Sequence, residues 1–178
     1  MLLYEDKVKT NKVDFIKKVY DISSALGIEP EWLMQVFMYE SGLDHTAVNK
    51  TTNATGLIQF MPATATALNT TVEKLKAMTN VAQLDYVYLY LKNYAGKINS
   101  YIDLYFSVFF PAAMNKADDW VFQTSNLSAS KIATQNPVFD LNKDGKLTVA
   151  EVREAMLKKV PSEWKAFFLK KKGRLQSV

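Results

Sequence analysis

Apolar residues recur along this chain mostly every three or four positions, the spacing of one face of an α-helix. Together with start and stop signals, this spacing predicts helices at 14–26, 30–42, from 62, from 70, and at 80–94, 100–110, 128–136 and 148–159. Residues 44–60 break the pattern with polar side chains and predict a loop or short hairpin. With few alternating stretches and no repeat or flexible linker, the sequence predicts a compact, mainly α protein.

Local signals mark several helix ends. Gly27 follows the last apolar position of the first helix, where a left-handed residue commonly ends a helix. Pro30 and Pro62 suit the first turn of the helices they open. Thr70 and Glu73 have the spacing of a capping box for a short helix.

One carboxylate lies where the helical pattern predicts a buried side chain. Glu40 shares its helical stripe with Leu33, Val36, Phe37 and Leu43. Burial disfavours the ionised carboxylate and raises its pKa, as a proton donor at neutral pH requires. A boundary glutamate whose carboxylate reaches solvent fits the pattern as well.

Composition excludes several kinds of chemistry. The chain has 178 residues, no cysteine and one histidine, His45, so disulfides, thiolate catalysis and multi-histidine metal sites are excluded. Carboxylates must carry any chemistry. The net charge of +4 favours anionic surroundings such as nucleic acid, an anionic membrane or a bacterial cell wall, without choosing among them.

Two motifs follow one another around the polar stretch. Residues 40–44 read E-S-G-L-D, and residues 56–64 read G-L-I-Q-F-M-P-A-T. In this order and spacing the pair resembles the soluble-lytic-type transglycosylases and the related goose-type lysozymes, over about residues 14–113. The resemblance implies a mainly α, lysozyme-like fold with a small loop or hairpin region and a cleft for peptidoglycan glycan strands.

The resemblance also implies roles for single residues. Glu40 matches the catalytic acid, which protonates the glycosidic oxygen between N-acetylmuramic acid and N-acetylglucosamine and then acts as base, with no cofactor in catalysis. Gln59 matches a cleft glutamine, and Ser41 is expected to contact an N-acetyl or peptide group. Asp44 and Glu31 are the candidates for a second acid. Neither matches a family position, which favours the single-acid transglycosylase route over hydrolysis.

The chain departs from the family in one place. Relatives usually carry an alanine-tyrosine-asparagine motif on a later helix, where this sequence has Phe110 and Pro111. Tyr105 replaces the missing hydroxyl, and contacts substrate, only if its helix turns it inward. The alternative function is therefore a catalytically weak glycan-binding or assembly component of a phage particle or secretion machine.

Residues 140–151 match the 12-residue EF-hand loop. Gly145 allows the sharp turn, and the expected ligands of a structural Ca²⁺ are Asp140, Asn142, Asp144, Lys146 through its carbonyl, Thr148 and Glu151. A D-G turn followed by a capping box at Thr148 and Glu151 is the alternative, but it leaves Asp140 and Asn142 unexplained. With no second loop to pair with, we expect a structural ion rather than a sensor.

These features predict three segments: a lysozyme-like catalytic domain at 1–127, an EF-hand-like segment at 128–160 and a basic helix or tail at 161–178.

We expect a monomer that acts on peptidoglycan in the cell wall or periplasm and binds no nucleic acid. Its basic end, with Lys158, Lys159, Lys165, Lys170, Lys171, Lys172 and Arg174, is expected to attract anionic envelope polymers. No signal peptide or transmembrane segment is visible, which predicts delivery by a phage, release by lysis, or origin in a longer secreted chain.

Overall fold

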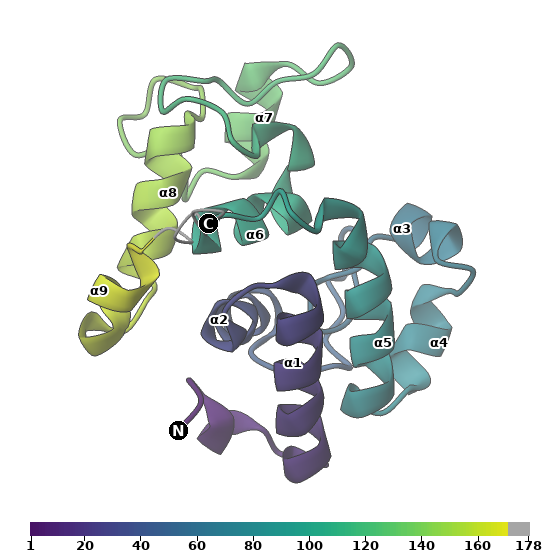
Figure 1. The fold of residues 1–178 in the computed structure, drawn as a ribbon. Coiled ribbons are helices and arrows are strands. Elements are labelled where there is room, and N and C mark those ends of the chain that lie inside the picture. Colours follow the sequence, from purple (N-terminus) through teal and green to yellow (C-terminus); the bar gives the residue numbers. More distant parts are fainter. Residues whose placement is uncertain (171–178) are drawn as a thin grey trace. The chain divides into compact units, whose positions relative to one another are not determined.

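The computed structural model describes residues 1–170, and the chain divides into two compact units after Ile98. The first unit is helical (Figure 1). Its elements are η1 (Glu5–Lys7), α1 (Lys12–Leu26), α2 (Pro30–Ser41), α3 (Pro62–Ala67), α4 (Val72–Ala77), α5 (Asn80–Leu91) and η2 (Lys92–Tyr94). The predicted helices of this unit are therefore present, most with ends shifted by one to three residues.

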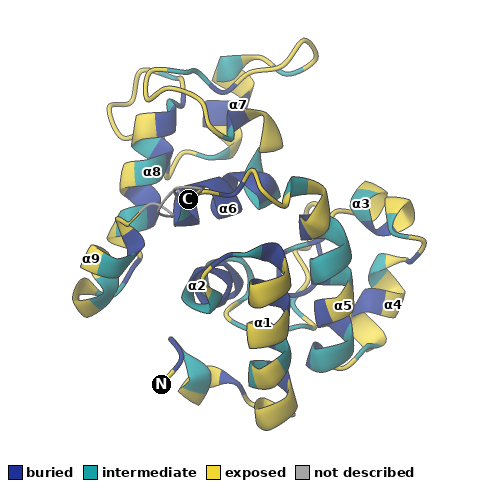
Figure 2. Cartoon of the chain, viewed as in Figure 1, coloured by how far each residue is buried: buried dark blue, intermediate teal, exposed yellow. Residues whose placement is uncertain are grey.

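Helix α1 packs against α2 and α5 through the stripe that its periodicity predicts. Phe15, Val19, Ile22 and Leu26 are buried, while most of its remaining residues are exposed (Figure 2). The helix ends at Gly27, whose φ of 62° is the left-handed conformation expected of a C-terminal glycine.

The polar segment between α2 and α3 forms a tight loop with isolated β-bridges, as predicted. Thr55 forms antiparallel bridges with both Val48 and Phe60. The N–H of Thr55 donates to the carbonyl of Phe60 at 3.0 Å, and the reverse bond measures 2.9 Å. The two motifs are therefore joined by an ordered turn structure.

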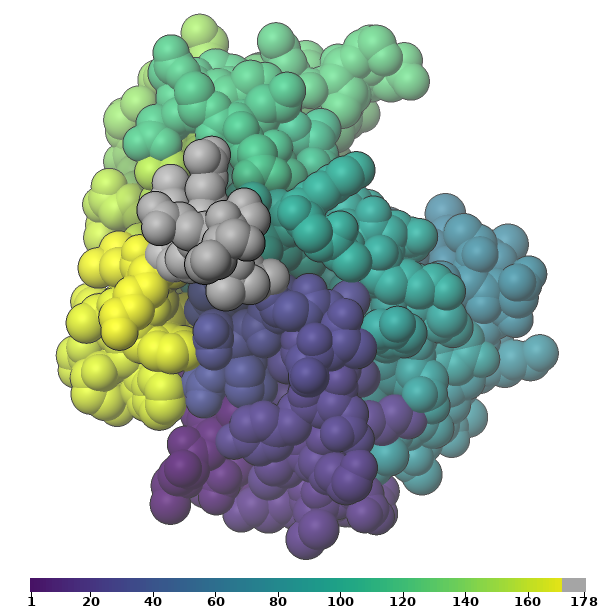
Figure 3. All heavy atoms as spheres, in the orientation of Figure 1, coloured from purple at the N-terminus to yellow at the C-terminus, as the bar shows by residue number. Residues whose placement is uncertain are grey.

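Helices α3 and α4 lie beyond α5 at an edge of the first unit, as the ribbon and the space-filling view both show (Figures 1 and 3). The predicted capping box of α4 is wrong by one residue. Thr71, not Thr70, accepts the N–H of Lys74, whereas Thr70 is buried. Burial of Thr70 removes its hydroxyl from the capping position.

The second unit holds a shorter set of helices. Its elements are α6 (Tyr101–Phe109), η3 (Pro111–Ala113), α7 (Ala129–Gln135), α8 (Val149–Lys158), η4 (Ser162–Trp164) and α9 (Lys165–Phe168). Three predicted helices begin at a residue that the structure shows to be the N-cap. The side chains of Ser100, Ser128 and Thr148 cap α6, α7 and α8 in turn, and each accepts the N–H of the third residue of its helix.

An aromatic cluster fills the centre of the second unit. Phe122 contacts Phe106 at 5.6 Å and Phe110 at 5.2 Å between ring centroids, and Phe139 contacts Phe109 at 5.2 Å. Such edge-to-face pairs stabilise the core beyond the burial of their area. The cluster anchors α6 against the segment that leads to the predicted calcium loop.

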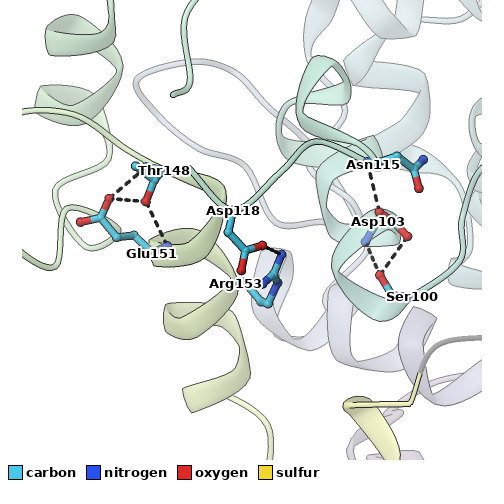
Figure 4. Close-up of polar contacts among 7 residues, drawn as sticks. All are labelled: Ser100, Asp103, Asn115, Asp118, Thr148, Glu151 and Arg153. Atoms are coloured by element: carbon cyan, nitrogen blue, oxygen red, sulfur yellow. Dashed lines mark hydrogen bonds and ion pairs between the residues drawn. The ribbon is translucent and has the colours of Figure 1, made fainter. Parts of the chain in front are cut away.

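Polar contacts organise the rest of this unit (Figure 4). The carboxylate of Asp103 accepts from the hydroxyl of Ser100 and the N–H of Asn115, at the start of α6. Arg153 of α8 forms an ion pair with Asp118. The connection after α6 is therefore tied both to α6 and to α8.

No helix among residues 1–170 is long and apolar enough to cross a membrane. The division after Ile98 concerns compactness alone, so the predicted domain bounds at 127 and 160 stay predictions.

Candidate active site

Glu40 lies in the last turn of α2, and its side chain is half-buried. Desolvation by burial raises the pKa of its carboxyl from 4.5 to about 7. The carboxylate makes no hydrogen bond or ion pair with any other residue of 1–170. The carboxyl of Glu40 is therefore partly protonated at neutral pH, as a general acid requires.

Ser41, next to this acid, connects α2 to the second motif. Its hydroxyl lies 3.0 Å from the carbonyl oxygen of Phe37 and 3.2 Å from that of Leu57, and both carbonyls accept from it. Because a hydroxyl has a single hydrogen, the two carbonyls share it, and only the oxygen lone pairs of Ser41 remain for a ligand.

Gln59 adopts a left-handed backbone conformation with a φ of 53°. Its amide nitrogen donates to the carbonyl of Gly56 at 3.1 Å and to that of Ala47 at 3.4 Å. No donor among residues 1–170 contacts its side-chain oxygen. The amide of Gln59 thus braces its own turn while its oxygen remains able to accept a hydrogen bond from a ligand.

Gln83 of α5 is a site neighbour that the motif comparison missed. Its side chain is fully buried, and its amide contacts Leu57 of the second motif and His45 in the loop between the two motifs. Gln83 lies on the same helical face as Asn80 and Val87, both buried. Glu40 was singled out because a polar residue occupies a position that helical periodicity predicts to be buried. The same signal is present at Gln83.

Neither predicted candidate for a second acid forms a hydrogen bond with the carboxyl of Glu40. Glu31 lies nine residues earlier on α2, about 13 Å along the axis and, at about 100° per residue, on the opposite face. Asp44 is exposed, and hydrogen bonds from Thr46 lower its pKa. Asp44 is therefore an ionised turn residue outside α2.

Tyr105 is 1% exposed in the core of the second unit. Its ring stacks on Phe109 at 5.5 Å between centroids and meets Phe139 edge-on. This burial favours packing over substrate contact for the Tyr105 ring. Phe110 packs on Trp120 and Phe122, and Pro111 opens η3, so neither supplies the hydroxyl or amide of the family motif.

The predicted calcium loop folds around its first carboxylate. Asp140 accepts the N–H groups of Asp144 at 3.1 Å and Gly145 at 3.0 Å, and Asn142 accepts that of Asp144 at 2.8 Å. Gly145 has a φ of 78°, as its sharp turn requires. Glu151 accepts the N–H of Asn142 at 3.4 Å. These bonds fold the segment into a tight turn around the carboxylate of Asp140.

The same loop also contains the capping box that the alternative explanation needs. Glu151 accepts from both the N–H and the hydroxyl of Thr148, and Thr148 caps α8 in return. Lys146 donates its N–H to Asp144. Within residues 1–170 no three His, Asp or Glu side chains converge as a metal site does. The donors fit Ca²⁺ in kind and order, and the Glu151 carboxylate accepts hydrogen bonds from Thr148 and Asn142 in this structure.

The loop has a pairing partner that the sequence analysis did not anticipate. Phe122 donates its N–H to the carbonyl of Leu147 at 2.9 Å, and Val149 donates to the carbonyl of Trp120 at 3.1 Å. Val121 and Thr148 form an antiparallel bridge between these bonds. Residues 120–122 therefore pair with the backbone of the loop, although they form no second EF-hand loop themselves.

A comparison with family models matched residues 19–109 to the transglycosylase SLT domain, just over half of the chain. A comparison with curated proteins found no match. The family match includes both motifs, α5 and Tyr105, and it ends before Phe110. It supports peptidoglycan cleavage of the lytic transglycosylase type at the level of the family. The chain belongs to the transglycosylase SLT domain family, as the paired motifs predict.

Proposed function

We propose that this protein is a lytic transglycosylase that cleaves the β-1,4 bond between N-acetylmuramic acid and N-acetylglucosamine, with Glu40 as its only catalytic carboxyl. The observation that carries the proposal is the half-buried Glu40 carboxyl, whose pKa of about 7 keeps it partly protonated at neutral pH. Its position in the E-S-G motif of a family member supports the assignment.

Glu40 first donates its proton to the glycosidic oxygen, the bond to C1 of the muramic ring breaks, and positive charge develops on that ring. The Glu40 carboxylate then takes the proton of the C6 hydroxyl of the same ring. The C6 oxygen bonds to C1, and a 1,6-anhydro sugar results. This route needs no second carboxylate, in agreement with the position of Glu31 on the opposite face of α2.

Gln59 and Ser41 would assist through the atoms that their internal contacts leave available. The side-chain oxygen of Gln59 accepts a hydrogen bond from a sugar hydroxyl or N-acetyl N–H, and the Ser41 oxygen can accept one likewise. Tyr105 would act by packing α6 rather than by touching the sugar, because its ring is buried.

Digestion of purified peptidoglycan followed by mass analysis tests the proposal. Wild-type protein should release anhydromuramic ends, and Glu40→Gln should release none while remaining folded. Glu31→Gln is the matched control, since it makes the same change on the opposite face of the same helix and should retain activity. Reducing ends in place of anhydro ends would show hydrolysis by water.

A second candidate is a glycan-binding or assembly component with weak turnover, favoured by Phe110 and Pro111 in place of the tyrosine and asparagine of the family motif. This candidate predicts that wild-type protein sediments with peptidoglycan but releases neither kind of end.

We also propose that residues 140–151 bind one structural Ca²⁺ through Asp140, Asn142, Asp144, the Lys146 carbonyl, Thr148 and Glu151. The support is the turn at Gly145 and the convergence of backbone N–H groups on Asp140 and Asn142. The ion would join the loop to the start of α8 and supply no catalytic chemistry.

The site of action proposed for this protein is the bacterial cell wall, as the family implies. Lys159, Lys165 and Lys170 are exposed and suit anionic envelope polymers. Lys158 is also exposed and forms an ion pair with Glu154. Lys171, Lys172 and Arg174 lie outside the described residues.

A further inference from the structure

Gln83 is buried in the first unit with none of its side chain exposed to solvent. Its amide nevertheless makes three hydrogen bonds. The oxygen accepts the N–H of Leu57 at 2.7 Å, and the nitrogen donates to the carbonyls of His45 and Leu75, each at 2.9 Å. Both hydrogens of the amide nitrogen are therefore used by backbone carbonyls.

These three bonds join segments that are distant in sequence. His45 begins the loop that follows the acid motif, Leu57 belongs to the second motif at the far end of that loop, and Leu75 lies in α4. A single side chain on α5 thus holds both ends of the loop. Buried amides of this kind are costly to leave unpaired, so the bonds specify one loop position.

The peptide groups of Leu57 connect Gln83 to the acid. The Leu57 N–H is held by Gln83, and the Leu57 carbonyl accepts from the hydroxyl of Ser41. Ser41 is the direct neighbour of Glu40. The second motif is therefore fixed on one side to α5 and on the other side to the last turn of α2.

The packing around Gln83 also accounts for the glycine of the second motif. A Cβ atom on Gly56 would lie 2.4 Å from the side-chain oxygen of Gln83 and 2.6 Å from its nitrogen. Such distances are too short for non-bonded atoms, so only glycine lets the Leu57 N–H reach the amide.

We propose that Gln83 is a positioning residue of the active site, which holds residues 56–59 against the end of α2 so that Glu40 and Gln59 act on the same glycosidic bond. This inference rests on the proposed function for its catalytic consequence. Its structural content, the placement of Leu57 and Gln59 by Gln83, is measurable without turnover.

Gln83→Met tests the proposal, since methionine has similar length but makes none of the three bonds. The kcat for soluble glycan fragments should fall at least about 10-fold with KM changed less than about 3-fold, because a displacement of about 1 Å costs a large part of the rate. Hydrogen exchange of the Leu57 N–H should accelerate at least about 10-fold.

Asn80→Ala is the matched control on the same helix. Asn80 is a buried amide whose nitrogen donates to the carbonyl of Thr10 at 2.7 Å and whose oxygen accepts from Asn11, neither of which belongs to the two motifs. Asn80→Ala should lower the free energy of unfolding by about as much as Gln83→Met does, and it should leave kcat within about 2-fold of wild type. Equal losses of kcat in both variants would show a general stability effect and overturn the proposal.

Gln83→Glu is the conservative variant if Gln83→Met does not fold. One carboxyl oxygen still accepts the Leu57 N–H, so exchange at Leu57 should stay slow and kcat should exceed that of Gln83→Met. Burial of a carboxyl beside two carbonyls makes this variant no more stable than Gln83→Met. If kcat of the two Gln83 variants varied with their stability and not with the exchange rate of the Leu57 N–H, a positioning role would be contradicted.

The two proposals fail in different ways. An inactive wild-type protein would remove the proposed reaction, and exchange at Leu57 and Gln59 would still decide whether Gln83 positions the loop. Unchanged exchange in a folded Gln83→Met variant would overturn the positioning role whatever the activity.

Discussion

The hydroxyl of Ser41 donates to the carbonyl oxygen of Leu57, 3.2 Å away, and thereby links the residue beside the acid to the second motif, 16 residues later in the sequence. Because the same hydroxyl also contacts the carbonyl of Phe37, it couples the helix end and the loop through one hydrogen. The two motifs are therefore one structural unit, and the serine of the first motif has a role within the protein itself.

Ser41→Ala should lower the free energy of unfolding by about 1 kcal/mol and reduce kcat several-fold, because the Leu57 carbonyl loses its donor. The control is Thr66→Ala, which removes a hydroxyl that donates only to the carbonyl of Pro62 in exposed α3. That control should change stability by less than about 0.5 kcal/mol. Denaturant unfolding and initial rates on peptidoglycan measure both effects, and equal behaviour of the two variants would contradict the link.

Gly42 and Gly56 both have positive φ but differ in the space around them, so their alanine variants distinguish the cost of backbone strain from the cost of a side-chain clash. A Cβ atom on Gly42 (φ 63°) would meet no atom within 4 Å, whereas one on Gly56 (φ 82°) would lie 2.4 Å from the side chain of Gln83. Gly42→Ala should lower stability by about 1 kcal/mol, the cost of the left-handed backbone alone. Gly56→Ala should lower it by at least about 3 kcal/mol, because the Gln83 amide must also move and lose bonds.

Thermal or urea unfolding of the two alanine variants compares these costs directly. A double variant with Gln83→Ala should show Gly56→Ala costing less in that background, since the clashing amide is gone. A Gly56→Ala cost that matches Gly42→Ala in both backgrounds would show that φ alone requires the glycine.

Helix positions were predictable from the sequence because local signals determine them. Gly27, Ser100, Ser128 and Thr148 each end or begin a helix through bonds to residues within four positions. The error at α4 shows the limit of such signals. Thr70 and Thr71 are adjacent and both able to cap, and burial of Thr70 by the rest of the fold decides between them.

The candidate site was predictable only where a motif or a periodicity pointed to it. Glu40 appeared through its place on an apolar stripe, and desolvation raises its pKa as that place implies. The contact of Gln83 with Leu57 spans 26 residues, and the pairing of residues 120–122 with Leu147 spans a similar distance. Helical spacing marks Gln83 as a buried polar residue, but no sequence pattern identifies Leu57 as its partner or pairs residues 120–122 with Leu147. Tertiary structure was therefore needed to find both contacts.

Calcium should raise the thermal stability of the wild-type protein, with a shift that chelator reverses, because an ion that binds only the folded state stabilises it by mass action. Glu151→Gln should abolish most of this shift. Glutamine preserves the capping box with Thr148 but cannot supply a bidentate carboxylate, so stability in chelator should stay near that of wild type. Asp119→Asn, an exposed acid outside the loop, should leave the shift intact. No calcium response in wild-type protein would remove the proposed site.

Glu40→Gln should make the protein inactive and, at pH 8, more stable. Burial raises the pKa of Glu40 from 4.5 in its ordinary state to about 7, so the folded protein holds this proton more tightly than the unfolded chain. Stability of the wild type therefore falls as pH rises from about 4.5 to about 7, by up to ~3 kcal/mol, through this group. Glutamine does not titrate, so Glu40→Gln avoids this loss. The variant should therefore exceed the wild type in stability by the full amount at pH 8 and by almost nothing near pH 4.5.

Urea unfolding of the wild type, Glu40→Gln and the control Glu31→Gln across this pH range measures the difference. The same ionisation should lower wild-type kcat as pH rises through about 7, because the general acid loses its proton. A stability difference that does not change with pH would show that Glu40 titrates normally, and the single-acid mechanism would then lack its proton donor at neutral pH.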